Sequence, residues 1–228
     1  MSPNPAWQAA PASAVDRPSR AAGDILGAAF DQLSGGRAMA FEPAEEIFGQ
    51  GEPANRVYRI LSGVVRVHRI LADGRRQICD FLHPGDVLGP EAGVLHAVSA
   101  EAVTPVTLQA VGRDALAARA AADVELAGVL WRLSIDWFNR ARDHMLILAR
   151  QGALERVAAF VLAYAERVGA VDGFDLPMTR QDIADYLGLT MHTVSRTLSQ
   201  MCVDHLIDMP SQRRVRLNGG RRLEAMVT

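Results

Sequence analysis

The sequence predicts an α+β chain in which an N-terminal β-roll or jelly-roll domain precedes a long helix and a C-terminal winged helix-turn-helix. Three changes of pattern along the 228 residues predict this architecture. Residues 37–113 hold short, strand-like segments between closely spaced turn signals. Residues 123–150 continue one helical pattern without interruption, and residues 179–217 read as two short helices followed by a hairpin.

The first domain is defined by its strands and turns. Residues 64–70 alternate in the period of a strand, and Asp73-Gly74 directly after them is a strong hairpin signal. Six or more short strands in this region favour a small antiparallel barrel or jelly roll. An amphipathic helix at residues 21–33 precedes the strands, so we assign residues 21–122 to this domain.

The long helix at residues 123–150 would extend over roughly 42 Å. A set of its side chains recurs at alternating spacings of four and three, as in a heptad seam. We therefore expect a dimerisation helix that forms a parallel coiled coil with a second copy of the chain. The alternative is a long helix packed on its own β-domain. The expected seam consists of Leu126, Leu130, Leu133, Trp137, Arg140, His144 and Ile147.

The segment 179–196 has the features of a helix-turn-helix. Thr179 and Thr190 can cap the starts of its two helices, and Gly188 suits a turn with positive φ. The second helix of this motif lies in the DNA major groove. An ordinary pair of packed helices, the alternative, does not predict polar side chains along the exposed start of the second helix. The base-reading candidates are His192, Ser195 and Arg196.

The rest of residues 151–228 completes a DNA-binding domain. Two short strand-like runs, residues 206–209 and 214–217, flank a turn and form a hairpin wing. Hydroxyl, amide and guanidinium groups near the helix starts and the wing tip are suited to DNA phosphates. For Arg180 and Gln181 a solvated surface is an equal alternative. The phosphate-contacting candidates are Thr179, Arg180, Gln181, Thr190, Thr193, Arg213 and Arg214.

Composition limits the remaining possibilities. The formal net charge is −2, but residues 178–228 hold seven Arg against five acidic residues, so the basic charge gathers at the DNA-binding end. Residues 1–20, rich in Pro, Ala and Ser, predict a disordered arm. We find no signal peptide, membrane-spanning run or catalytic constellation, and expect a cytoplasmic protein that is not an enzyme.

The two cysteines, Cys79 and Cys202, form neither a disulfide framework nor a zinc pattern, so no metal site is expected. Cys202 lies near the end of the second helix of the motif. Its oxidation could disturb DNA docking, which makes it a candidate redox switch. The alternative is a buried packing residue.

A barrel, a long helix and a winged helix-turn-helix in this order resemble the CRP/FNR family of bacterial transcription regulators, over residues 22–217. The most specific segments are residues 73–78, 84–89, 182–190 and 193–196, which look closest to the FixK branch. The resemblance implies a cyclic-nucleotide-binding-like β-roll and a homodimer bound to a palindromic TTG-type operator. It also implies contact with RNA polymerase, activation of transcription, and control of microaerobic or nitrogen-oxide-linked genes.

Two sensors known in this family lack their residues here. The first cysteine is Cys79, so the N-terminal ligands of an iron–sulfur cluster are missing. Cyclic-nucleotide members clamp the phosphate with an arginine, and this sequence has Val98-Ser99 at that place. We therefore expect no cofactor and no cAMP response. The alternative is a β-roll that binds haem or another small molecule to sense a gas or nitric oxide, with His68, His83 and His96 as candidate haem ligands.

One base-reading position departs from the family pattern. Ser195 and Arg196 match it, and Arg196 suits guanine O6 and N7. His192 stands where Glu is usual. Because a neutral imidazole can accept from cytosine or donate to guanine, we expect a changed preference at the G·C pair of the half-site.

Overall fold

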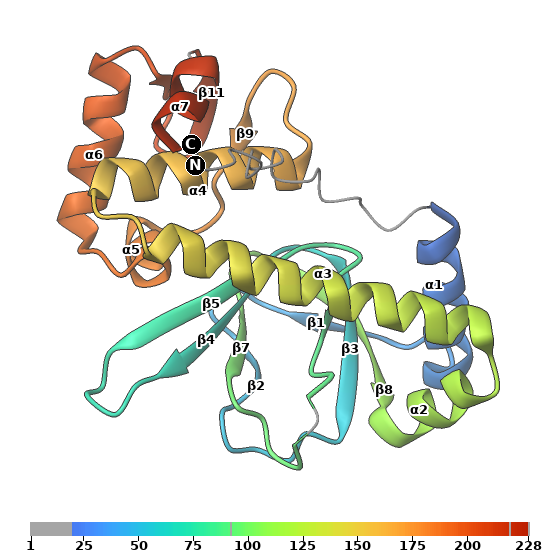
Figure 1. The fold of residues 1–228 in the computed structure, drawn as a ribbon. Coiled ribbons are helices and arrows are strands. Elements are labelled where there is room, and N and C mark those ends of the chain that lie inside the picture. The colour runs from blue at the N-terminus through green and yellow to red at the C-terminus, as the bar shows by residue number, and fades with distance from the viewer. Residues whose placement is uncertain (1–19, 92, 219, 228) are drawn as a thin grey trace, which may run out of the picture.

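The computed structural model describes residues 20–91, 93–218 and 220–227. The expected disordered arm lies outside the described residues, except that Arg20 begins the first helix. A β-domain, one long helix and a C-terminal helical domain follow one another along the chain, and the long helix runs across the two domains (Figure 1). The α+β class with these three parts confirms the predicted architecture.

The β-domain consists of two four-stranded antiparallel sheets, ordered β1-β8-β3-β6 and β2-β7-β4-β5. Apolar side chains from both sheets, such as Ile60, Val65 and Leu108, are buried in one cluster. The predicted hairpin is present, because β4 and β5 pair directly and Gly74 has φ +82° in the turn between them. The strands are β1 (Ala38–Phe41), β2 (Glu46–Phe48), β3 (Arg56–Ser62), β4 (Val65–Ile70), β5 (Arg76–Leu82), β6 (Val87–Leu88), β7 (Ser99–Ala102) and β8 (Val106–Gly112).

Three helices close one side of this domain. They are α1 (Arg20–Ser34), α2 (Arg113–Ala121) and α3 (Val124–Leu148). Phe30 of α1, Leu116 of α2 and Leu126 of α3 are buried in a common cluster, which anchors the start of α3 to the β-domain. The Asp123 carboxylate caps α3 by accepting from the Leu126 amide at 3.1 Å.

The predicted dimer seam on α3 needs correction, because its side chains contact their own chain. Leu126, Leu130 and Leu133 belong to or pack on the cluster with α1 and α2. Arg140, His144 and Ile147 contact the β-domain and the C-terminal domain, and Trp137 is half-buried. A four-three spacing marks any stripe along a helix, and this stripe is the one that the monomer buries.

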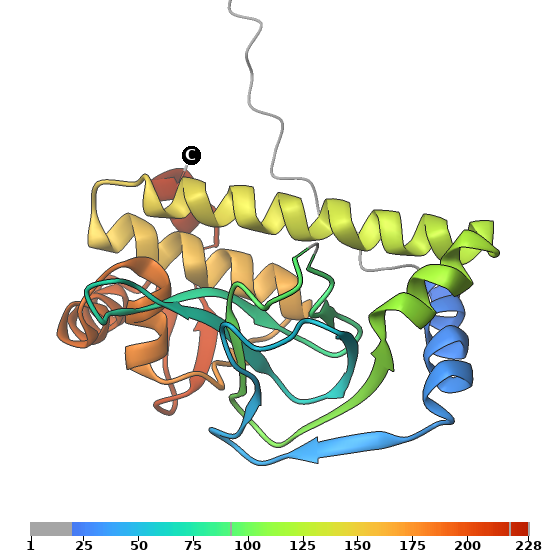
Figure 2. The ribbon, with the colours of Figure 1, turned by 90° about the horizontal axis from the view of Figure 1, so that it is seen from below.

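A second stripe of α3 is exposed. In Figure 2 the upper side of α3 has no other described element over most of its length, and only the red α7 shows behind its left end. Its large apolar side chains are 42% to 88% exposed, which is unusual for residues of this type on one face. These side chains are Val124, Trp131, Ile135, Phe138 and Met145.

The C-terminal domain has a helical core and a small sheet, ordered β10-β11-β9. Apolar residues of α4, α5 and α6 meet in it, among them Val161, Ile183 and Leu198. The wing is present as the antiparallel pair β10–β11. The elements are α4 (Ala153–Val168), β9 (Phe174–Asp175), α5 (Arg180–Leu187), α6 (Met191–Val203), β10 (Ile207–Asp208), β11 (Arg214–Leu217) and α7 (Gly220–Val227).

The two domains share one hydrophobic core. Ile78 and Phe81 of β5 are buried in the same cluster as Phe160 of α4. The Phe81 ring lies 6.5 Å from the Phe160 ring in an edge-on arrangement and 5.6 Å from the Tyr186 ring of α5, centroid to centroid. The C-terminal domain is therefore packed on the outer face of the β5 sheet.

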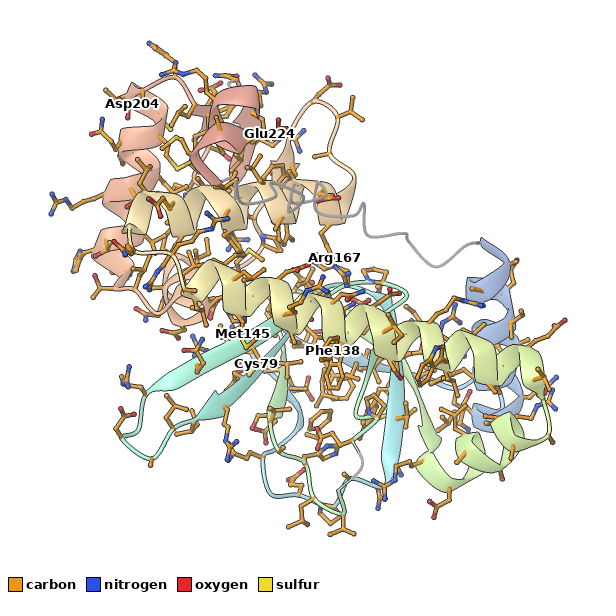
Figure 3. The ribbon with its side chains drawn as sticks, in the orientation of Figure 1. Cys79, Phe138, Met145, Arg167, Asp204 and Glu224 are labelled. Atoms are coloured by element: carbon orange, nitrogen blue, oxygen red, sulfur yellow. The ribbon has the colours of Figure 1, made fainter. Side chains whose placement is uncertain are left out.

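Charged and titratable groups surround this shared core. Arg167 of α4, labelled in Figure 3, pairs with Asp86 of the β5–β6 turn. In the same turn the His83 ring packs on Tyr164 with 5.4 Å between centroids. Burial, and secondly the nearby Arg167 guanidinium, lowers the pKa of His83 to about 4.

Replacing Phe81 by Ala removes a ring buried between both domains. We expect the free energy of unfolding to fall by about 3–5 kcal/mol, as for other buried phenylalanines. Because the core is shared, both domains should lose stability together in urea denaturation followed by circular dichroism. Cys79→Ala, at an exposed position of the same strand, should change stability by less than about 0.5 kcal/mol. Loss of stability in the β-domain alone would contradict a shared core.

Stability should also fall as the pH drops from about 6.5 to about 4, the interval between the ordinary histidine pKa and that of folded His83. In this interval the unfolded chain binds a proton that folded His83 does not, so acid favours unfolding. We expect His83→Gln to remove about 2 kcal/mol of this pH-dependent loss. Urea titrations of both proteins at pH 7 and pH 4.5 measure the difference. Equal pH-dependent losses in both proteins would contradict the assignment.

Candidate DNA interface

The helix-turn-helix is built by local capping and one glycine turn. Thr179 Oγ1 accepts from the Asp182 amide at 3.0 Å, and the Asp182 carboxylate accepts from the Thr179 amide at 3.0 Å, which forms a capping box at the start of α5. Gly188 ends α5 with φ +62°, a conformation that glycine adopts without strain. Thr190 caps α6 by accepting from the Thr193 amide at 3.2 Å. Both predicted caps and the glycine turn are confirmed.

One face of α6 is fixed in the core and the other is open. Val194 and Leu198 are at most 3% exposed and hold the helix against the rest of the domain. The candidates His192 and Arg196 are exposed and Ser195 is half-buried, all on the opposite face. Figure 1 places α6 at the outer edge of the molecule. This face is available to a DNA groove.

The phosphate candidates differ in their present partners. Arg180 Nη2 donates to the Gln212 carbonyl at 2.7 Å, which ties the start of α5 to the wing. Gln181 Nε2 donates to Asp185 Oδ1 at 2.6 Å. Arg214 pairs with Asp175 at 3.2 Å, whereas Arg213 is exposed at the tip of the wing.

The threonines of the two caps complete this set. Thr179 and Thr190 stand at the N-termini of α5 and α6, where orphan amides favour an anion. The Thr193 hydroxyl lies 2.8 Å from the Thr190 hydroxyl and is therefore already engaged in the α6 cap.

Aromatic rings pack inside the β-domain next to the turn after β6. The His96 ring, 3% exposed, stacks on Phe48 with 3.8 Å between centroids and 14° between planes. Glu91 Oε1 lies 3.3 Å from His96 Nδ1, and Glu91 Oε2 accepts from the Ala97 amide at 2.8 Å. Val98 packs on the core of the two sheets. The turn is thus folded onto the barrel by its own side chains.

The three histidines considered as haem ligands lie in different surroundings. His96 faces Phe48 within the barrel, whereas His83 packs on Tyr164 at the domain interface. His68 is buried on β4, where desolvation lowers its pKa. Across the described ranges, no three His, Cys, Asp or Glu side chains form a group that could hold a metal ion.

Cys202 is half-buried in α6, and burial raises the pKa of its thiol, with the Asp208 carboxylate as the second cause. A raised pKa keeps the protonated thiol, which is the less reactive form. Cys202 also packs, partly buried, against the core of the C-terminal domain, as the packing alternative describes, and the redox switch stays a prediction.

Sequence reasoning missed two features around this interface. One is the exposed stripe of α3, and the other is a group of ion pairs between the β4–β5 hairpin and α5. The spacing of apolar residues could have indicated the stripe. The ion pairs join residues more than 100 positions apart, and no local pattern marks them.

Comparison with known proteins places these features in context. A model of the cyclic nucleotide-binding domain matches residues 38–123, and a model of the Crp-like helix-turn-helix domain matches residues 155–226. The nitrogen fixation regulation protein FixK of Azorhizobium caulinodans is 46% identical over 187 residues, which cover 80% of this chain and 75% of that protein. FixK of Rhizobium meliloti is 41% identical over 184 residues, with 80% and 84% covered.

A solved structure agrees with these relatives. The structure of FixK2 from Bradyrhizobium japonicum superimposes with a TM-score of 0.79 at 41% identity. The match covers 84% of this chain and 97% of that one, so it includes both domains.

Proposed function

Because this chain belongs to the CRP/FNR family of transcription regulators and is similar to its FixK members, we propose that it binds a palindromic TTG-type operator as a homodimer. The observation that carries the proposal is the open polar face of α6, with His192, Ser195 and Arg196 over a helix anchored in the core. We assign Arg196 to a guanine. We assign His192, the position at which this chain departs from the family pattern, to the G·C pair of the half-site.

The exposed stripe of α3 supports the homodimer. Val124, Trp131, Ile135, Phe138 and Met145 follow the spacing of a heptad seam, with Gly128 and Arg142 at the two intervening positions. In Figure 3 Phe138 and Met145 lie along the same edge of α3. A second copy presenting the same stripe would cover it and place two recognition helices side by side.

The proposed regulon is microaerobic or nitrogen-oxide-linked, with activation through RNA polymerase. Two FixK relatives are named as nitrogen fixation regulators, and the AadR protein of Rhodopseudomonas palustris, 36% identical, is named as a transcriptional activatory protein. Among the described helices, none has the length and apolar character to cross a bilayer. We place the regulator in the cytoplasm, where its operator is found.

The β-domain is proposed to work without cAMP or an iron–sulfur cluster. The family-typical phosphate arginine is replaced at Val98, whose side chain packs on the barrel core. In the same turn region, the His96 ring is buried and stacks on Phe48.

Replacing Arg196 by Ala should reduce discrimination between the operator and scrambled DNA, because a bidentate contact to guanine is lost. A loss of about tenfold to a hundredfold in operator affinity is expected, with little change on scrambled DNA. Arg213→Ala, at the wing tip, serves as the matched control. It should weaken binding to all sequences alike and reduce the salt slope by about one. Fluorescence anisotropy over a range of salt concentrations measures both, and equal effects of the two variants would contradict these roles.

Introducing Glu at Phe138, which is 67% exposed, should convert the dimer into a monomer, since a charge cannot be buried in an apolar seam without a partner. Sedimentation velocity at micromolar concentration measures the mass. Val171→Glu, 93% exposed in the loop between α4 and β9, should remain dimeric. A dimeric Phe138→Glu variant would contradict the proposed interface.

A further inference from the structure

Two arginines of the β4–β5 hairpin meet two aspartates of α5 where the domains touch. Arg76 Nη2 donates to Asp182 Oδ1 at 2.7 Å, and Arg76 Nε donates to Asp185 Oδ2 at 2.8 Å. Arg66 Nη1 lies 3.3 Å from Asp182 Oδ1 and is itself held by a two-point contact with Glu101 of β7. A single guanidinium therefore bridges two successive turns of α5.

Asp182 has a second task in this cluster. It is the capping-box residue of α5, and its Oδ2 accepts from the Thr179 amide at 3.0 Å and from the Thr179 hydroxyl at 2.7 Å. The residue is 1% exposed. Burying a carboxylate costs free energy unless partners of opposite charge compensate it, and the guanidinium groups of Arg66 and Arg76 lie beside this one. The hairpin thus supplies charged partners to the residue that caps the first helix of the DNA-binding motif.

The other end of α5 is also held from outside the motif. The Tyr186 carbonyl accepts from Gln77 Nε2 of β5 at 3.3 Å and lies 2.7 Å from His144 Nε2 of α3. The His144 and Tyr186 rings are stacked with 3.8 Å between centroids and 4° between planes. Arg156 Nη1 of α4 donates to the Leu187 carbonyl at 3.1 Å. These contacts hold the end of α5 against α3, α4 and β5.

We propose that Arg66 and Arg76 are positioning residues for operator binding, which set the angle of α5, and with it α6, relative to α3. The proposal rests on the proposed function, because in a dimer joined along α3 this angle fixes the distance between the two recognition helices. Successive major grooves of a palindrome lie about 34 Å apart, so a fixed distance selects one half-site spacing.

The same cluster reaches a phosphate candidate. Asp185, held by Arg76 on one oxygen, accepts from Gln181 Nε2 on the other at 2.6 Å. Gln181 stands in the first turn of α5, next to the N-terminus that would face the DNA backbone. The hairpin thus orders a DNA-facing side chain as well as the helix that carries it.

A merely stabilising role and a positioning role differ in one measurable property. A stabilising pair affects all DNA targets alike, whereas a positioning pair determines which half-site spacing the dimer accepts. Duplexes are first enriched from a random library by the wild-type protein. Binding is then measured on the enriched palindrome and on versions with its spacer lengthened or shortened by one base pair, with Arg76→Ala beside the wild type. Amide hydrogen exchange of Arg180–Leu187 is followed in the free proteins.

We expect Arg76→Ala to reduce the preference for the native spacing by about tenfold and to speed exchange in α5. Arg76→Lys, which keeps a positive charge beside Asp182 and Asp185, should retain part of both. Arg75→Ala is the control in the same hairpin, because the Arg75 side chain is 76% exposed and pairs with Asp73 in its own turn. It should leave spacing preference and exchange unchanged. Thermal unfolding verifies that each variant is folded.

An Arg76→Ala protein that still binds with wild-type spacing preference would overturn the positioning role, whether or not α5 exchanges faster. Failure of the wild type to enrich any duplex would be a different result. It would contradict the proposed function itself, and the role in operator binding with it.

Discussion

The burial of β5 beneath α4 and α5 is the contact on which the rest of the structure depends. Ile78 and Phe81 are strand residues of the β-domain, yet they are buried among side chains of the DNA-binding domain. Separating the domains would expose these buried apolar side chains to water, which costs free energy. The two domains therefore form one body and not two units on a flexible tether. Any change in the direction of α6 must then rearrange this core.

Polar contacts around that core fix the orientation of α5 on the sheet that contains β5. Hydrophobic burial is non-directional and would tolerate some sliding of α5 over the sheet. Ion pairs and hydrogen bonds do not, because their strength depends on geometry. Arg76 at the start of α5 and His144 near its end hold two points on one short helix, and two points define an axis. Asp182 joins this restraint to the helix cap, so the local and the long-range structure depend on the same carboxylate.

The sequence predicted the parts that local chemistry determines. The Asp73-Gly74 hairpin, the caps at Thr179 and Thr190 and the exposed face of α6 all follow from turn propensity, capping and periodicity over a few residues. The seam on α3 could not be assigned in this way, because two stripes of the helix carry apolar side chains at heptad spacing. Only tertiary packing decides that Leu126 faces the β-domain while Trp131 faces outward. The partners of Arg76 are likewise fixed by the docking of two domains.

With its two stripes, α3 joins the proposed dimer contact to the orientation of the DNA-binding domain. Its inner side reaches β5 through the pair Arg140–Asp80, with 2.9 Å between Nε and Oδ2, and reaches α5 through His144. Its outer side carries the apolar stripe proposed to meet the second copy. In the β-domain, the stacked Phe48 and His96 rings pack the barrel from within. The same helix thus carries the surface proposed for the second copy and, on its other side, a contact that holds α5.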